Sequence, residues 1–86
     1  MAVKLRLYSR AGCHLCAAML QELKALQRAR MGTFTVEVLD IDRDPEIQLR
    51  YCLRIPVLTG LADGEVLCET RFDRNSVLEY LAGTTH

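Results

Sequence analysis

The sequence has no excess of charge and no long apolar stretch, and these two absences exclude several classes of protein. Eleven lysine and arginine residues balance eleven aspartate and glutamate residues, whereas a nucleic-acid-binding surface needs a basic patch. No segment approaches the roughly 18 apolar residues of a membrane-spanning helix. The first ten residues, MAVKLRLYSR, also lack the apolar run of about 7–15 residues that a signal peptide contains. We therefore expect a cytoplasmic protein with no nucleic-acid or membrane partner.

Proline and glycine are scarce as well, with two and five residues, and no linker, repeat or low-complexity segment interrupts the chain. Half of the 86 residues are hydrophobic, which suits an ordinary globular protein with one core. We expect a single domain over residues 1–86, present as a monomer.

The first half of the chain predicts a strand, a helix and a strand. Apolar and polar residues alternate over residues 3–8 and again over residues 34–41. Between them, from residue 13 onward, apolar positions repeat every three or four residues, which indicates a helix. This order predicts two parallel strands joined by a right-handed crossover. Lys4 and Arg6 fit poorly, because a central parallel strand is usually apolar on both faces.

The second half predicts a short helix, a hairpin and a last helix. An Asp-Pro pair at residues 44–45 is typical of a helix start. Residues 56–61 and 65–69 indicate two strands, and the Asp-Gly pair at residues 63–64 favours a tight primed turn between them. Asp73 is expected to cap the last helix. The predicted order is β-α-β-α-β-β-α, an α/β fold.

Two of the four cysteines, Cys13 and Cys16, lie three positions apart where the first strand gives way to the helix. Unpaired N–H groups and the helix dipole favour a thiolate at Cys13, and Arg10 and a protonated His14 act in the same direction. Cys16 lies one turn further along the helix and is more enclosed. We therefore expect Cys13 to be the nucleophile and Cys16 the resolving thiol of a disulfide exchange.

The segment YSRAGCHLC resembles the active-site motif Y-S-K-x-x-C-P-Y-C of glutaredoxins, with Tyr8 and Arg10 at matching positions. The later segment RIPVL resembles the cis-proline signature of the thioredoxin superfamily. This resemblance implies a four-stranded mixed sheet with helices on both faces and a cis bond before Pro56. It also implies that the backbone of Ile55 and Pro56 pairs with an extended peptide or with glutathione.

Two departures from the glutaredoxin pattern concern the ligand. His14 and Leu15 replace the usual Pro-Tyr, and the Gly-Gly-x-Asp that holds the glutamyl end of glutathione is missing. Asp73 is the remaining acidic candidate there, and Arg10 is the candidate for a carboxylate at the other end. We predict no tightly bound cofactor, weak glutathione binding, and reduction of the disulfide mainly by a protein dithiol, with glutathione as the alternative reductant.

The sequence leaves two other functions open. One is a thioredoxin-fold module that binds a partner protein and uses the cysteine pair as a redox switch with little turnover. The other is a carrier that holds iron–sulfur or zinc with the same pair. The remaining cysteines, Cys52 and Cys68, have poor spacing for a zinc site, so we expect core thiols and no metal. The leading prediction is an enzyme that reduces or exchanges disulfides of a protein or a small thiol.

Overall fold

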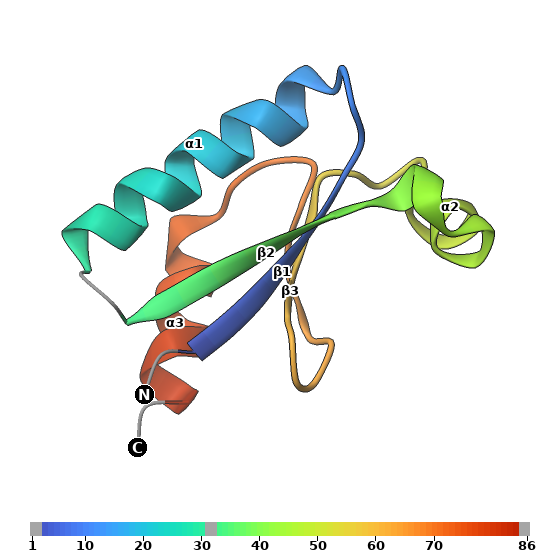
Figure 1. Cartoon of the computed structure of the whole chain (residues 1–86). Helices are drawn as coiled ribbons and strands as arrows, with labels where there is room; N and C mark the ends of the chain where they lie inside the picture. The colour runs from blue at the N-terminus through green and yellow to red at the C-terminus, as the bar shows by residue number, and fades with distance from the viewer. Residues whose placement is uncertain (1–2, 31–32, 85–86) are drawn as a thin grey trace.

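The computed structural model describes residues 3–30 and 33–84, which form a four-stranded sheet flanked by helices (Figure 1). The order β-α-β-α-β-β-α is the predicted one, with a short 3-10 helix added after the second strand. The elements are β1 (Val3–Ser9), α1 (His14–Ala29), β2 (Phe34–Asp40), η1 (Ile41–Arg43), α2 (Pro45–Tyr51), β3 (Val57–Gly60), β4 (Val66–Glu69) and α3 (Arg74–Thr84).

The strands are ordered β2-β1-β3-β4. β1 runs parallel to β2, with Val3 opposite Phe34 and Ser9 opposite Asp40, and β3 is antiparallel to both β1 and β4. The predicted parallel pair and mixed sheet are confirmed. Because β1 and β2 are parallel and in register, the segments that follow them meet at the same edge of the sheet.

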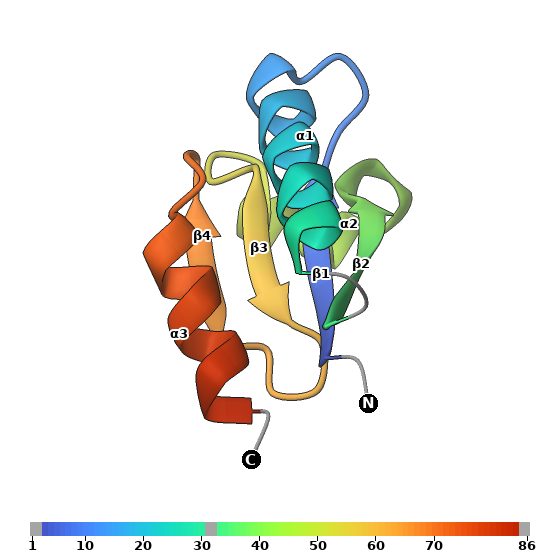
Figure 2. The ribbon, with the colours of Figure 1, turned by 90° about the vertical axis from the view of Figure 1, so that its left-hand side faces the viewer.

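Helices cover both faces of the sheet, as predicted. Figure 2 shows α1 and α3 on the face toward the viewer and α2 behind the sheet. The larger core lies with α1 and α3 and contains Leu5, Leu7, Met19, Leu23, Leu26, Phe34, Leu58, Leu67, Cys68, Val77 and Leu81. A smaller core contains Ile41, Tyr51 and Val57.

The connection between β3 and β4 differs from the predicted tight turn. It spans residues 61–65, and Gly64 has a positive φ of 69° whereas Asp63 does not. Both primed two-residue turns need a positive φ at their first central residue, which would be Asp63 here. Instead, the Asp63 carboxylate accepts a hydrogen bond from the Glu65 N–H at 3.0 Å. This local bond stabilises a longer loop.

Arg6 is accommodated in the central strand by its neighbours. Its guanidinium pairs with Glu37, the residue opposite it on β2, at 3.4 Å, and lies 5.9 Å from the centroid of the Tyr8 ring. A hydrogen bond to Tyr8 is the main cause that raises the pKa of Arg6. α2 has only seven residues and packs near Tyr8, while Lys4 at the start of the strand is exposed. Lys4 and Arg6 therefore lie on the part of the α2 face of the sheet that no helix covers.

Candidate active site

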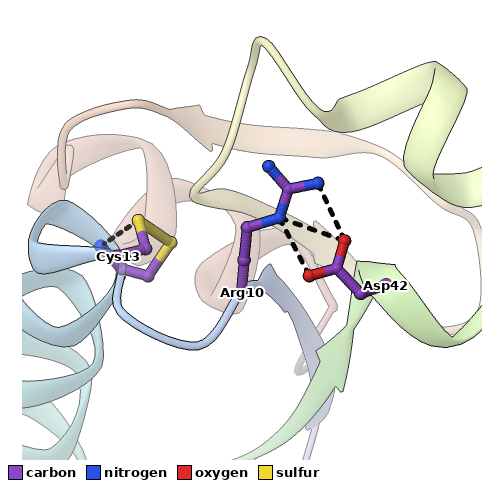
Figure 3. The surroundings of a disulfide bond; sticks show 4 residues. Arg10, Cys13 and Asp42 are labelled. Atoms are coloured by element: carbon purple, nitrogen blue, oxygen red, sulfur yellow. Dashed lines mark hydrogen bonds and ion pairs between the residues drawn. A yellow bond between two sulfur atoms is a disulfide. The ribbon is translucent and has the colours of Figure 1, made fainter.

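A disulfide joins Cys13 to Cys16, whose Cα atoms are 5.2 Å apart (Figure 3). Gly12 has a φ of 80°, a left-handed conformation that glycine adopts at little cost. The chain then turns so that the Cys13 N–H donates to the Arg10 carbonyl at 3.2 Å. This turn ends β1 and places Cys13 directly before the first residue of α1.

The two sulfurs have different surroundings. Cys13 is half-buried, whereas the side chain of Cys16 is 2% exposed. Cys13 caps α1 and its Sγ accepts a hydrogen bond from the Cys16 N–H at 3.1 Å. The first turn of α1 contains no acidic residue, so its dipole acts on Cys13 unopposed by a carboxylate of that turn. The more accessible of the two sulfurs is therefore the one at the helix N-terminus.

Of the two residues predicted to assist Cys13, His14 lies beside it and Arg10 is engaged elsewhere. His14 is the first residue of α1 and its side chain is exposed. The Arg10 guanidinium points away from the disulfide toward Asp42 (Figure 3). It donates from Nε to both carboxylate oxygens at 3.1 and 3.0 Å and from one terminal nitrogen at 2.8 Å. The carboxylate offsets the positive field that Arg10 would otherwise exert at Cys13.

Tyr8 lies in the smaller core. Its ring stacks on that of Tyr51 at the end of α2, with the centroids 4.3 Å apart. The guanidinium of Arg54 lies 5.1 Å from the Tyr51 centroid, and Arg54 also pairs with Glu69 of β4. This chain of contacts ties β1, the end of α2 and β4 together.

The bond between Ile55 and Pro56 is cis, as the resemblance implied. Both residues have internal backbone partners. The Ile55 N–H donates to the Tyr51 carbonyl at 3.0 Å, and the Pro56 carbonyl accepts from the Thr70 N–H at 2.8 Å. Figures 1 and 2 both place this loop, the β1–α1 turn and the loop before α3 at the same end of the sheet. Backbone hydrogen bonds therefore hold this loop on both sides of the cis bond.

Asp73, the predicted acidic contact for a ligand, caps α3. Its carboxylate accepts from the Ser76 N–H at 3.2 Å and from the Ser76 hydroxyl at 2.8 Å, and these bonds lower the pKa of Asp73. Its predicted capping role is therefore present in the structure.

The loop before α3 also holds a strained residue. Thr70 has a φ of 66°, an uncommon conformation for a β-branched residue. Thr70 begins the segment that stands where glutaredoxins have Gly-Gly-x-Asp. The backbone keeps a conformation suited to glycine although the side chain is threonine.

The remaining two cysteines are free thiols. Cys68 is buried in β4, where its Sγ accepts from the Asp73 N–H at 3.2 Å. Burial is the main cause that raises the pKa of Cys68. Cys52 is half-buried at the end of α2 and packs against the smaller core.

Sequence reasoning did not identify Asp42 as a partner of the site. The residue lies in η1 directly after β2, and Gln48 of α2 adds a hydrogen bond to its Oδ1 at 2.9 Å. The predicted parallel pair of strands could have indicated that Asp42 lies near Arg10. Residues that follow two adjacent parallel strands lie at one edge of the sheet, so the cation after β1 and the carboxylate after β2 were candidates for pairing.

A half-exposed cysteine at the start of a helix is disulfide-bonded to a buried cysteine one turn later, and the helix packs on a four-stranded mixed sheet. These features define a thioredoxin-fold protein with a CxxC disulfide. The sequence profile of the glutaredoxin-like domain (DUF836) matches residues 4–82. The chain belongs to this glutaredoxin-like family.

Solved structures show the same fold. Protein Ne2328 from Nitrosomonas europaea, solved by NMR, is 34% identical over 93% of this chain and 92% of its own, with a TM-score of 0.81. The crystal structure of protein XcR50 from X. campestris is also 34% identical, over 93% of this chain and 97% of its own, with a TM-score of 0.64. Thioredoxin 1 from Thermosipho africanus, at 18% identity over 96% of this chain and 99% of its own, has a TM-score of 0.60 and shares the fold. Comparison with curated protein sequences found no match.

Two features are absent from residues 3–30 and 33–84. No helix among them is long and apolar enough to cross a membrane. These residues also contain no group of three or more histidine, cysteine, aspartate or glutamate side chains that could hold a metal ion.

Proposed function

We propose that this protein is a cytoplasmic thiol–disulfide oxidoreductase in which Cys13 is the nucleophile and Cys16 the resolving thiol. The observation that carries the proposal is the asymmetry of the pair: Cys13 is half-exposed at the start of α1, and Cys16 is 2% exposed behind it. An accessible sulfur can reach a substrate disulfide, whereas an enclosed one can reach only its neighbour. His14, exposed beside Cys13, is the residue we expect to stabilise its thiolate when the imidazole is protonated.

The reaction proceeds in two exchanges. The Cys13 thiolate attacks one sulfur of the substrate disulfide, forming a mixed disulfide and releasing the other substrate sulfur as a thiolate. The Cys16 thiolate then attacks the Cys13 sulfur, which forms the Cys13–Cys16 disulfide and releases the second substrate thiolate. The substrate gains two electrons and the protein loses two. A dithiol reductant returns the protein to its starting state by the reverse steps.

A hollow near this site supports a polypeptide as the substrate. It has a volume of about 220 Å³ and lies between α1 and the loop before α3. Leu15, which lies between the two cysteines, forms an apolar part of its lining together with Met19 and Phe72, and the charged Glu22 and Arg71 also line it. An apolar side chain beside the target disulfide would fit such a lining. Thr70 and Arg71 stand where the glutaredoxin motif has its glycine pair, and their bulk also suits a peptide better than glutathione.

Single cysteine variants test the assignment in an insulin-reduction assay driven by dithiothreitol. We expect wild type and the control Cys52→Ser to accelerate the reaction, because Cys52 lies outside the disulfide. Cys13→Ser should be inactive, and Cys16→Ser should accumulate a mixed disulfide with the substrate, visible by mass spectrometry. Full activity of Cys13→Ser would refute the assignment. Mixed disulfides without insulin reduction by the wild type would favour the binding module with little turnover.

A further inference from the structure

The cation nearest in sequence to the disulfide is held by an internal carboxylate. Three hydrogen bonds of 2.8–3.1 Å join Arg10 to Asp42, and Gln48 adds one to the same carboxylate at 2.9 Å. The bond from Arg10 is the main cause that lowers the pKa of Asp42. The carboxylate is therefore ionised at neutral pH and paired in a two-pronged geometry that single surface ion pairs lack.

Arg10 is close to Cys13 along the backbone. Its carbonyl accepts the Cys13 N–H at 3.2 Å, so the two residues belong to one backbone turn. Arg10 lines an open hollow of about 460 Å³ together with Arg43 and Asp40. A carboxylate on a small thiol could reach this guanidinium from solvent, but Asp42 already occupies the edge formed by Nε and one terminal nitrogen, which a carboxylate would bind in two-pronged geometry.

We propose that Asp42 is a specificity-determining residue that disfavours small thiols carrying carboxylates, glutathione among them, as reductants of the Cys13–Cys16 disulfide. The inference rests on the proposed function, since it concerns the same exchange. A first glutathione thiolate attacks Cys13, forms a mixed disulfide and releases the Cys16 thiolate. A second attacks the glutathione sulfur, releasing oxidised glutathione and the Cys13 thiolate. In the mixed disulfide, Asp42 stays paired with the Arg10 guanidinium, so this cation is less available to the glutathione carboxylate.

The test compares glutathione with glutathione diethyl ester, which keeps the thiol and the amine but has no charged carboxylate. The rate of reduction of the Cys13–Cys16 disulfide is measured with each thiol, and their ratio reports the carboxylate preference. We expect Asp42→Asn, which keeps the size of the side chain, to raise the ratio of glutathione to ester by about 3- to 10-fold. Asp42→Ala should do the same, and adding Arg10→Gln to Asp42→Asn should remove the gain.

The matched control is Glu37→Gln, which removes the carboxylate of the Arg6 ion pair and changes the net charge by the same amount. It should leave the ratio unchanged. An equal gain in Glu37→Gln, or no gain in either Asp42 variant while dithiothreitol still reduces the disulfide, would overturn the inference alone. A disulfide that resisted dithiothreitol in the wild type would overturn the proposed function and this inference with it.

Discussion

The ring of Tyr8 stacks on the ring of Tyr51, with their centroids 4.3 Å apart and their planes inclined by 23°. Tyr8 leads into the active-site turn and Tyr51 ends the helix that precedes the cis-proline loop. The guanidinium of Arg6 lies 5.9 Å from the Tyr8 centroid, and that of Arg54 lies 5.1 Å from the Tyr51 centroid. The stacked rings therefore connect the two segments that form the site.

We predict that Tyr51→Ala lowers the free energy of unfolding by about 3 kcal/mol, as truncation of a large buried aromatic side chain usually does. Tyr51 is 9% exposed, and the change removes both the stacking and the packing against the smaller core. Urea denaturation followed by circular dichroism measures the effect. Tyr51→Phe, which keeps the ring, should remain within about 1 kcal/mol of wild type. A similar loss in both variants would show that stacking is not the source of stability.

Local patterns in the sequence were sufficient for most of the fold. The alternation over residues 3–8 and the helical spacing from residue 13 each reflect which side chains face the core, and that information is carried by neighbours in the chain. The disulfide pair was likewise visible from the three-residue spacing of Cys13 and Cys16. The predicted hairpin turn was wrong in detail, because the Asp63 carboxylate accepts a hydrogen bond from the Glu65 N–H within a longer loop, and residue preference alone does not reveal such a bond.

The rest of the site depends on contacts between distant segments. The pairing of Arg10 with Asp42 requires the register of β1 and β2 and the direction that η1 takes after β2. The left-handed conformation of Thr70 accompanies a hydrogen bond to the Pro56 carbonyl, and no pattern around residue 70 indicates that bond. Such details follow from tertiary structure, which overrides local preference.

The strained conformation of Thr70 gives a second stability prediction. A left-handed conformation costs a residue with a Cβ about 1–2 kcal/mol, and glycine loses about 0.4–1 kcal/mol through the greater freedom of the unfolded chain. We expect Thr70→Gly to raise the free energy of unfolding by up to about 1 kcal/mol. Urea denaturation is again the measurement. Thr70→Val, which keeps the branched Cβ, should show no gain, and destabilisation by glycine would contradict the strain argument.

Two glycines form a matched pair for a third prediction. A Cβ at Gly60 would lie 2.7 Å from the Tyr80 ring carbon that bears the hydroxyl, and closer still to the Tyr80 oxygen. A Cβ at Gly83, within α3, would meet nothing within 4 Å. We expect Gly60→Ala to destabilise the fold by about 1–3 kcal/mol and Gly83→Ala to be neutral or stabilising by up to about 1 kcal/mol. Equal effects of the two changes on the urea midpoint would contradict this reading of the packing.

The lowered pKa of Asp42 predicts a pH dependence of stability. A carboxyl group whose pKa is lower in the folded than in the unfolded state stabilises the fold above its ordinary pKa, here 3.8. That stabilisation is lost as the pH falls through the lower pKa of the folded protein. Wild type should therefore have a higher urea midpoint than Asp42→Asn at neutral pH, and the two should converge in acid. A difference that persisted unchanged below the folded pKa would rule out the Arg10 pair as its source.

The last prediction concerns the order in which the reduced thiols react. A raised pKa leaves a smaller fraction of a thiol ionised at a given pH, and the thiolate is the form that reacts. Burial raises the pKa of Cys68 above 9.0 and also shields its sulfur, whereas Cys13 is half-exposed at the start of α1. Iodoacetamide should therefore label Cys13 first and leave Cys68 unlabelled in the folded protein near neutral pH. Mass spectrometry of timed samples gives the order, and labelling in urea is the control that should make Cys68 accessible. Labelling of Cys68 at the rate of Cys13 in the folded protein would show that the buried thiol opens to solvent, and the assignment of a single reactive cysteine would fail.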